Sequence, residues 1–154
     1  MTEDTDWQAK ATAIKANITA KIPKEYLLPK SLYPLPLDVS NIVGESNLLS
    51  PLELKIISQD ATGIRDAIAS RTYTSVAVAI AFAKASAICH QATNCLLDYF
   101  PDEAIERAKW LDGEMERTGK IVGSLHGVPI SVKGEFGFQM LDVRCWISRC
   151  WGQS

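Results

Sequence analysis

The sequence has no cluster of like charge. Its 16 lysine and arginine residues are spread among 18 aspartate and glutamate residues, which leaves a formal net charge of −2 at pH 7. A protein that binds a phosphate backbone or an anionic membrane surface usually concentrates its basic residues in a patch. We therefore predict neither a nucleic-acid partner nor a membrane partner.

A secretion leader and a long hydrophobic run are also missing. Residues 1–10, MTEDTDWQAK, are acidic and contain no basic segment followed by an apolar run. The most apolar stretch, residues 75–92, is interrupted by Lys84, whereas a membrane span needs about 20 predominantly apolar residues. These features predict a cytoplasmic protein in which residues 75–92 form a packed helix.

The sequence lacks a cysteine spacing that would suit a local cross-link or a metal site, although it has 4 cysteines. Cys89 and Cys95 fall on different faces of a predicted helix, which argues against a disulfide between them. Cys145 and Cys150 have no second cysteine or histidine pair nearby, as a structural zinc site would need. We expect buried free thiols, and neither a metal nor a cofactor.

What the sequence does contain is a series of helix signals. Its 154 residues, 47% of them hydrophobic, are enough for one domain with a core. Apolar residues at helical spacing predict a helix over 6–21, and the proline-rich segment 22–43 is apolar enough to wrap over a surface. Further helix starts are predicted at Ser50-Pro51, Asp60, Thr74 and Pro101. Residues 1–120 thus read as a helical region, with a central helix over 75–99 and a C-cap at Gly119.

A strand signal appears only after Gly123. The stretch SLHGVPISVK, residues 124–133, predicts a glycine- and proline-containing loop that leads into a short apolar strand ending at Lys133. We interpret His126 as a turn histidine with a backbone partner, and His90 as a satisfied, half-buried side chain of the central helix. Ser131 receives no role. The acidic residues near the end of the last helix are expected on a solvated face, namely Asp112, Glu114 and Glu116.

This stretch resembles the amidase signature family, in which a similar strand opens the core. The upstream motifs HQATNCL, residues 90–96, and AKWLD, residues 108–112, are similar to the fungal acetamidase-like branch of general amidases. The likeness covers most of residues 5–138. It implies an α/β fold in which an N-terminal helical layer, residues 1–120, leads into the first strand of a mixed sheet, within residues 121–138.

The resemblance also implies an activity. Members hydrolyse a carboxamide C–N bond to an acid and ammonia or an amine, using a serine, a cis-serine and a lysine without a metal or cofactor. The resemblance places Lys133 in the lysine position, and a small amide would be the substrate. To act as a base near pH 7, the lysine needs a pKa lowered by about three units, which burial can impose at a cost of about 4 kcal/mol.

Two features depart from the family pattern. The glycine- and serine-rich region that would carry the nucleophile does not follow Lys133, and Ser148 and Ser154 match no motif, so no nucleophile is assigned. Residues 139–154 are interpreted as a divergent tail. We therefore expect a truncated, N-terminal piece of an amidase that is inactive alone. The alternative is a non-catalytic helical interaction module or pseudoenzyme fragment.

Overall fold

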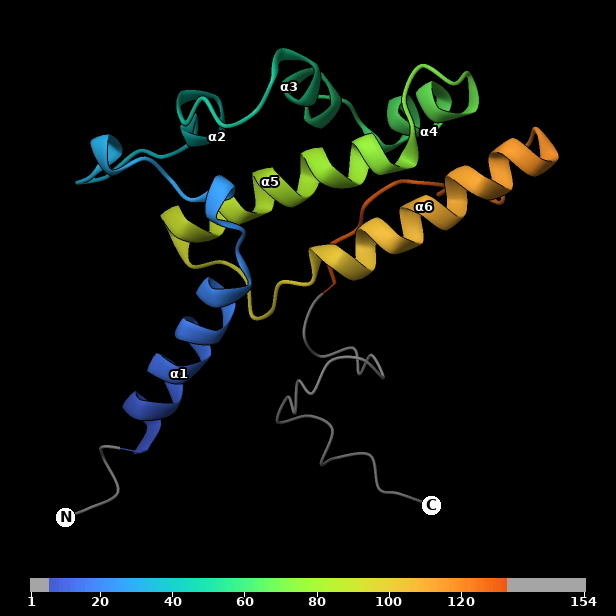
Figure 1. Cartoon of the computed structure of the whole chain (residues 1–154). Helices are drawn as coiled ribbons and strands as arrows, with labels where there is room; N and C mark the ends of the chain where they lie inside the picture. The colour runs from blue at the N-terminus through green and yellow to red at the C-terminus, as the bar shows by residue number, and fades with distance from the viewer. Residues whose placement is uncertain (1–5, 133–154) are drawn as a thin grey trace, which may run out of the picture.

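The computed structural model describes residues 6–132, and within this range the chain is built from helices and ordered turns (Figure 1). The elements, with η marking a single 3-10 turn, are α1 (Asp6–Lys21), η1 (Lys24–Tyr26), η2 (Lys30–Leu32), α2 (Ile42–Glu45), α3 (Pro51–Ile57), α4 (Ala61–Ala69), α5 (Ser75–Thr93) and α6 (Pro101–Thr118). The helix starts predicted from the sequence are confirmed.

Local hydrogen bonds explain why these helices begin where they do. The Ser50 hydroxyl accepts from the backbone N–H of Glu53 at 3.2 Å, and the Glu53 carboxylate accepts from the Ser50 N–H at 2.7 Å. This reciprocal pair is the predicted capping box of α3. Asp60 caps α4 by accepting from the N–H of Gly63 at 2.7 Å, and Thr74 caps α5 in the same way.

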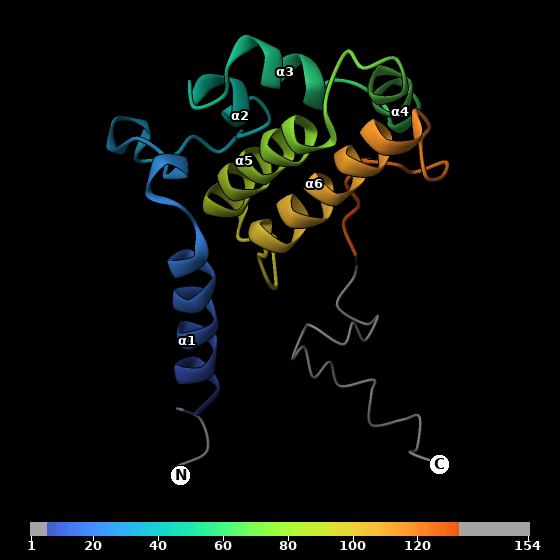
Figure 2. The same cartoon turned by 45° about the vertical axis from the view of Figure 1, so that its right-hand side comes forward.

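The helix α5 lies at the centre of the helical layer, packed against α6 on one side and against α3 and α2 on the other (Figures 1 and 2). Small side chains along it, such as Ala81 and Ala87, are fully buried and let neighbouring backbones approach closely. By length and hydropathy alone α5 could also cross a membrane, but the core helix of a soluble protein passes the same test. Within the structure, 33% of the apolar stretch of α5 is buried. The predicted central position is confirmed, but burial is less complete than a deep core helix would show.

The end of α5 differs from the prediction. The sequence pattern continued to residue 99, but the helix ends at Thr93 because Asn94 adopts a left-handed conformation with φ +54°. The N–H of Asn94 bonds the carbonyl of His90 at 2.7 Å, and the chain then turns back so that the Leu96 N–H reaches the His90 side chain. Asparagine tolerates this conformation better than most residues do.

The proline-rich segment wraps over the end of α5, as the sequence predicts. The side chain of Gln91 accepts from the N–H of Leu28 at 2.9 Å and donates to the carbonyl of Tyr26 at 2.8 Å. Leu28 is buried in a cluster with Ile42, Leu49 and Ile88. Only part of the segment is covered, because Leu37 is fully exposed.

Figures 1 and 2 show α1 projecting away from the other helices. Its C-terminal end is attached through Ile18 and through Ile22, the residue after the helix, which pack with Ala87 and Tyr99. An ion pair of 2.5 Å joins Lys21 to Asp98 at the same place. The apolar stripe predicted for this helix is buried only at its C-terminal end, since Ile14 is 53% exposed.

The expected α/β architecture is seen only in its helical part. Across residues 6–132 the structure contains no strand, and the described end of the expected strand, residues 128–132, has no regular secondary structure. A β-strand is stabilised by ladder bonds to a partner strand, and residues 6–132 supply none. The predicted C-cap of α6 is confirmed, because Gly119 ends the helix in a left-handed conformation with φ +70°. The expected tail, residues 139–154, lies outside the described residues.

Candidate active site

Lys133, the residue expected to act as the catalytic base, lies directly beyond the described residues. The segment that leads to it runs back from the end of α6 along the helical layer (Figure 1). Ser131 and Val132 are exposed at the end of this segment, and so is Ile130 at 70%. Val128 instead packs against the buried cluster of Ile56, Ile64, Ile68, Tyr73, Val78 and Ala81. The segment is therefore held on the helical core at Val128 and is exposed from Ile130 to Val132.

Gly127 sits in a slot too narrow for any side chain. Its φ is +69°, and a Cβ built there would lie 2.5 Å from Cδ1 of Ile68 and 2.7 Å from Oγ of Ser75. Real Cβ atoms do not approach other heavy atoms so closely. The glycine of the HGVP motif therefore lets the backbone touch both α4 and α5. The sequence predicted a turn here but gave no indication of this close approach.

His126 closes the turn that precedes Gly127. Its side chain is buried at 3% exposure, and its Nδ1 accepts from the backbone N–H of Val122 at 3.0 Å. The predicted turn histidine with a backbone partner is confirmed. Two backbone bonds complete the arrangement, from the N–H of His126 to the Gly123 carbonyl at 3.0 Å and from that of Val128 to the Leu125 carbonyl at 3.1 Å.

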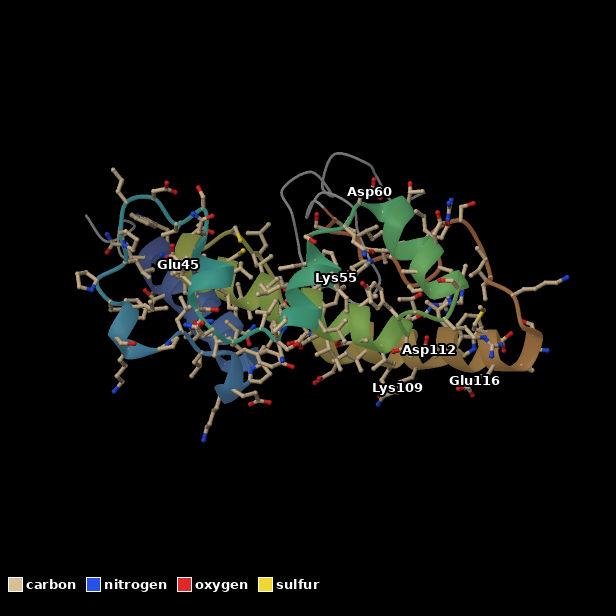
Figure 3. The ribbon with its side chains drawn as sticks, turned by 90° about the horizontal axis from the view of Figure 1, so that it is seen from above. Glu45, Lys55, Asp60, Lys109, Asp112 and Glu116 are labelled. Carbon is tan, nitrogen blue, oxygen red and sulfur yellow. The ribbon has the colours of Figure 1, made fainter. Side chains whose placement is uncertain are left out.

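Asp112 has a role that the sequence did not indicate. Its carboxylate accepts from the backbone N–H groups of Ser75 at 2.7 Å and Val76 at 3.0 Å, at the first turn of α5. Figure 3 shows Asp112 between α5 and α6, whereas Lys109 lies on the outer side of α6. The expected solvated position of Asp112 is therefore wrong. A carboxylate stabilises a helix N-terminus because it satisfies unpaired N–H groups and the helix dipole.

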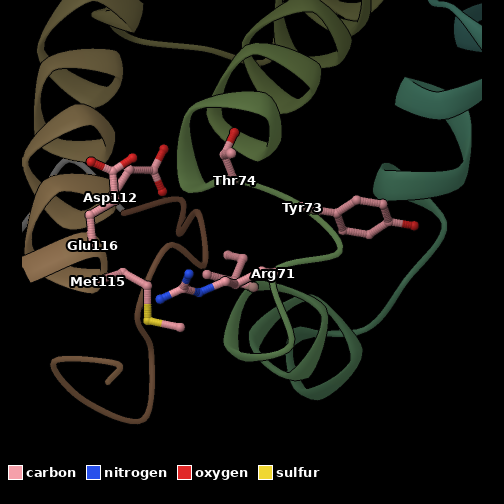
Figure 4. A pocket seen from close by; sticks show the side chains of 7 residues that line it. Arg71, Tyr73, Thr74, Asp112, Met115 and Glu116 are labelled. Atoms are coloured by element: carbon pink, nitrogen blue, oxygen red, sulfur yellow. The ribbon is translucent and has the colours of Figure 1, made fainter. Parts of the chain in front are cut away.

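A cavity of about 150 Å³ opens beside Asp112. It is lined by Ile68, Arg71, Tyr73, Thr74, Asp112, Met115 and Glu116, most of which Figure 4 labels. The Arg71 side chain extends toward Met115, and the two carboxylates come from α6. Ligand pockets usually measure about 300–1,000 Å³, so the cavity is small, and we assign it no substrate.

The other candidate residues have structural roles. His90 is buried, its Nδ1 accepts from the Leu96 N–H at 3.1 Å, and burial lowers its pKa. Cys89 is half-buried, and burial, with a smaller contribution from the neighbouring Cys95, raises its pKa. The expected burial of both thiols is wrong for Cys95, which is exposed beyond the end of α5. Cys145 and Cys150 lie outside the described residues.

A metal site is not suggested by the described part of the chain. Within residues 6–132, no three side chains of the histidine, cysteine, aspartate or glutamate type gather closely enough to hold an ion. The expectation that the protein uses neither metal nor cofactor stays a prediction, because the residues around Lys133 are not described.

Comparison with known proteins identifies the family. The family model described as Amidase matches residues 77–145, which include α5, α6 and the segment that leads to Lys133. An acetamidase of Aspergillus oryzae is 39% identical over 129 residues, which are 84% of this chain and 23% of the relative. An acetamidase of Emericella nidulans is 36% identical over 129 residues, with the same two coverages, 84% and 23%. The chain belongs to the amidase family.

A solved amidase-family structure shows the same arrangement of helices. The structure of a fatty acid amide hydrolase superposes with a TM-score of 0.68 at 32% sequence identity, covering 84% of this chain and 24% of that one. The chain thus spans about a quarter of the length of the amidases it matches. The resemblance noted in the sequence, including the fungal acetamidase-like branch, is confirmed.

Proposed function

We propose that this chain forms the lysine-bearing part of an amide hydrolase that converts a small carboxamide to an acid and ammonia or an amine. The observation that carries the proposal is the match to amidases through residues 77–145, which include Asp112 and the segment held at Gly127. Fungal relatives carry the name acetamidase, so a small aliphatic amide is the proposed substrate.

In the proposed reaction, Lys133 is the base of a serine, cis-serine and lysine triad. A neutral amine accepts a proton relayed from the nucleophilic serine, the serine oxygen attacks the amide carbon, and the same proton leaves with the amine product. Water then hydrolyses the acyl-enzyme. Both serines belong to the glycine- and serine-rich region of the family, and this sequence has no match to that region. Turnover by the chain alone is therefore not expected.

The predicted mixed sheet and its first strand belong to the same proposal. We infer that the helical layer covers a mixed sheet whose first strand includes residues 128–133. The segment beyond Val128 supports this, because Ile130 is 70% exposed and Val132 is 41% exposed on a stretch that bonds to no partner in the described range. The partly open faces of α5 point the same way. A cytoplasmic location stays a prediction.

A chimera tests this function. Residues 1–138 would replace the segment that they match in the Aspergillus oryzae acetamidase, and acetamide hydrolysis would be followed by ammonia release. We expect activity in the chimera, its loss by at least a thousandfold in Lys133→Ala, and none in the chain alone. Lys109→Ala is the matched control, because Lys109 is an exposed lysine of α6 and should leave activity unchanged. An inactive but folded chimera would refute the proposal.

The second candidate, a helical module that acts only by contact, is favoured by the exposed apolar side chains. Trp110 on α6 is 46% exposed, and Leu125 and Ile130 are 62% and 70% exposed. Size-exclusion chromatography with light scattering of the chain separates the two functions. A folded monomer supports the contact module, whereas self-association through the open segment fits an incomplete hydrolase.

A further inference from the structure

The C-terminal end of α5 carries two cysteines that the fold brings toward each other. Cys89 lies within the helix and is half-buried, whereas Cys95 lies beyond the helix and is exposed. In a helix that continued to residue 99, the two side chains would lie on different faces. The helix ends at Thr93 instead, so that separation does not hold.

The left-handed cap of α5 explains how the two cysteines meet. Asn94 has φ +54°, and its N–H bonds the His90 carbonyl at 2.7 Å. In caps of this kind the residue after the left-handed one commonly contacts the residues five and six positions before it. For Cys95 these are His90 and Cys89. The Leu96 N–H then bonds Nδ1 of His90 at 3.1 Å, which holds the reversing chain against the last turns of α5 (Figure 1).

The acidity of Cys89 agrees with this arrangement. Burial raises the pKa of the Cys89 thiol, and the charge of the Cys95 thiolate adds to the rise. Charges at a protein surface affect each other's titration only when they are close, because salt screens them over about 10 Å. The cap geometry and this charge effect agree that the two thiols are neighbours.

We propose that Cys89 and Cys95 form a redox-active pair that closes into a reversible disulfide. The oxidant is a small disulfide of the glutathione type. The exposed Cys95 thiolate attacks one of its sulfur atoms, which breaks the S–S bond and releases one glutathione thiolate. The Cys89 thiol then loses its proton, attacks the Cys95 sulfur of the mixed disulfide and releases the second glutathione. Two electrons and two protons thus pass from the pair to the oxidant.

This disulfide would fasten the connection between α5 and α6. Leu96, the next residue after Cys95, packs against the buried cluster that attaches α1, which consists of Ile18, Ile22, Ala87 and Tyr99. The Tyr99 hydroxyl also donates to the Ala83 carbonyl of α5 at 3.0 Å. A bridge at Cys95 therefore holds the reversal on which this cluster depends. The inference is independent of the proposed hydrolysis.

Oxidation of the full chain in glutathione buffers provides the first test. After alkylation of free thiols, trypsin releases residues 85–107, which contain Cys89 and Cys95 but neither Cys145 nor Cys150. The bridged peptide lacks two hydrogens and carries no alkyl group, so its fraction gives the equilibrium constant for closure. We expect this constant to be at least about tenfold larger in the native chain than in denaturing urea. An equal or smaller native constant, or bridges between two chains instead, would overturn the inference.

The melting temperature provides the second test. If closure is tenfold more favourable in the native state, the bond stabilises that state by about 1.4 kcal/mol. The oxidised chain should then melt about 3–6 °C above the reduced chain. The measurement uses Cys145→Ser with Cys150→Ser, so that no other thiol reacts. Adding Cys89→Ser gives the matched control, in which oxidation should not raise the melting temperature. A bridged chain that melts no higher than the reduced one would overturn the inference.

Single replacements test the order of the two steps. In Cys89→Ser the mixed disulfide on the exposed Cys95 should accumulate, because no second thiol displaces the glutathione. In Cys95→Ser the half-buried Cys89 should form its mixed disulfide at least about tenfold more slowly. The reverse order of rates would refute the attack by Cys95. None of these measurements uses amide hydrolysis, so their failure leaves the proposed function untouched, and an inactive chimera leaves the thiol pair untouched.

Discussion

Replacing Gly127 with alanine tests how the segment before Lys133 is held. The new methyl group would lie 2.5 Å from Cδ1 of Ile68, 2.7 Å from Oγ of Ser75 and 3.0 Å from its Cβ. Ile68 and Ser75 are both buried, at 2% and 0% exposure, so neither has open space to move into. Holding a residue with a Cβ at φ +69° costs about 1–2 kcal/mol. Overpacking adds about 1–3 kcal/mol, so the free energy of unfolding should fall by about 2–5 kcal/mol.

Urea denaturation of the full chain measures this loss. Gly113→Ala is the control, because nothing lies within 4 Å of a Cβ at this position inside α6, and alanine there should stabilise the protein by up to about 1 kcal/mol. Ile68→Val removes the nearest atom, so Gly127→Ala should cost at least about 0.5 kcal/mol less in that background. A Gly127→Ala protein as stable as the original would refute the close approach.

Three further predictions concern the contacts around α5. Asp112→Ala should lower the free energy of unfolding in urea by about 1–3 kcal/mol, because two N–H groups at the helix start lose their acceptor; a loss below 0.5 kcal/mol would contradict this. Burial alone would raise the pKa of Glu53, but hydrogen bonds from Lys84 and Ser50 outweigh it and lower the pKa. The stabilisation is therefore present above the ordinary value near 4.3 and lost as pH falls through the lowered pKa, so Glu53→Gln should be less stable than the original at pH 7 but not at pH 3. Burial lowers the pKa of His90, so stability should fall as pH drops below about 6.5, and the melting temperature of His90→Asn should change less between pH 7.5 and 5.

The helix starts could be predicted because the residues that decide them are close in sequence. The capping box of α3 needs only Ser50 and Glu53, and α4 needs only Asp60 and the N–H groups that follow it. The C-cap of α6 depends on Gly119, whose missing Cβ permits a left-handed conformation. Such signals stay valid whatever the rest of the chain does, so sequence reasoning recovered them.

Contacts between distant residues could not be predicted in the same way. Asp112 has the same local surroundings as an ordinary solvated carboxylate of α6, and only the packing of α6 on α5 brings it to the N–H of Ser75. The end of α5 was missed for a related reason. The apolar pattern continues past Asn94, but the chain reverses there and Leu96 returns to bond His90. Periodicity records which residues are apolar and not whether one helix contains them all.

The helix α5 is more apolar than its packing against the other described helices requires. This helix of 19 residues has the hydropathy of a membrane span, but only 33% of its apolar stretch is buried. Burying apolar surface stabilises a fold by about 25 cal/mol per Å², so the half-buried apolar side chains along α5 would contribute more stability if another surface covered them. The amidases that this chain matches are about four times its length, and the fatty acid amide hydrolase structure superposes on only 24% of its own chain. A helix that serves as an inner layer of a larger body is expected to look too apolar when seen with its outer neighbours alone, and α5 has this character.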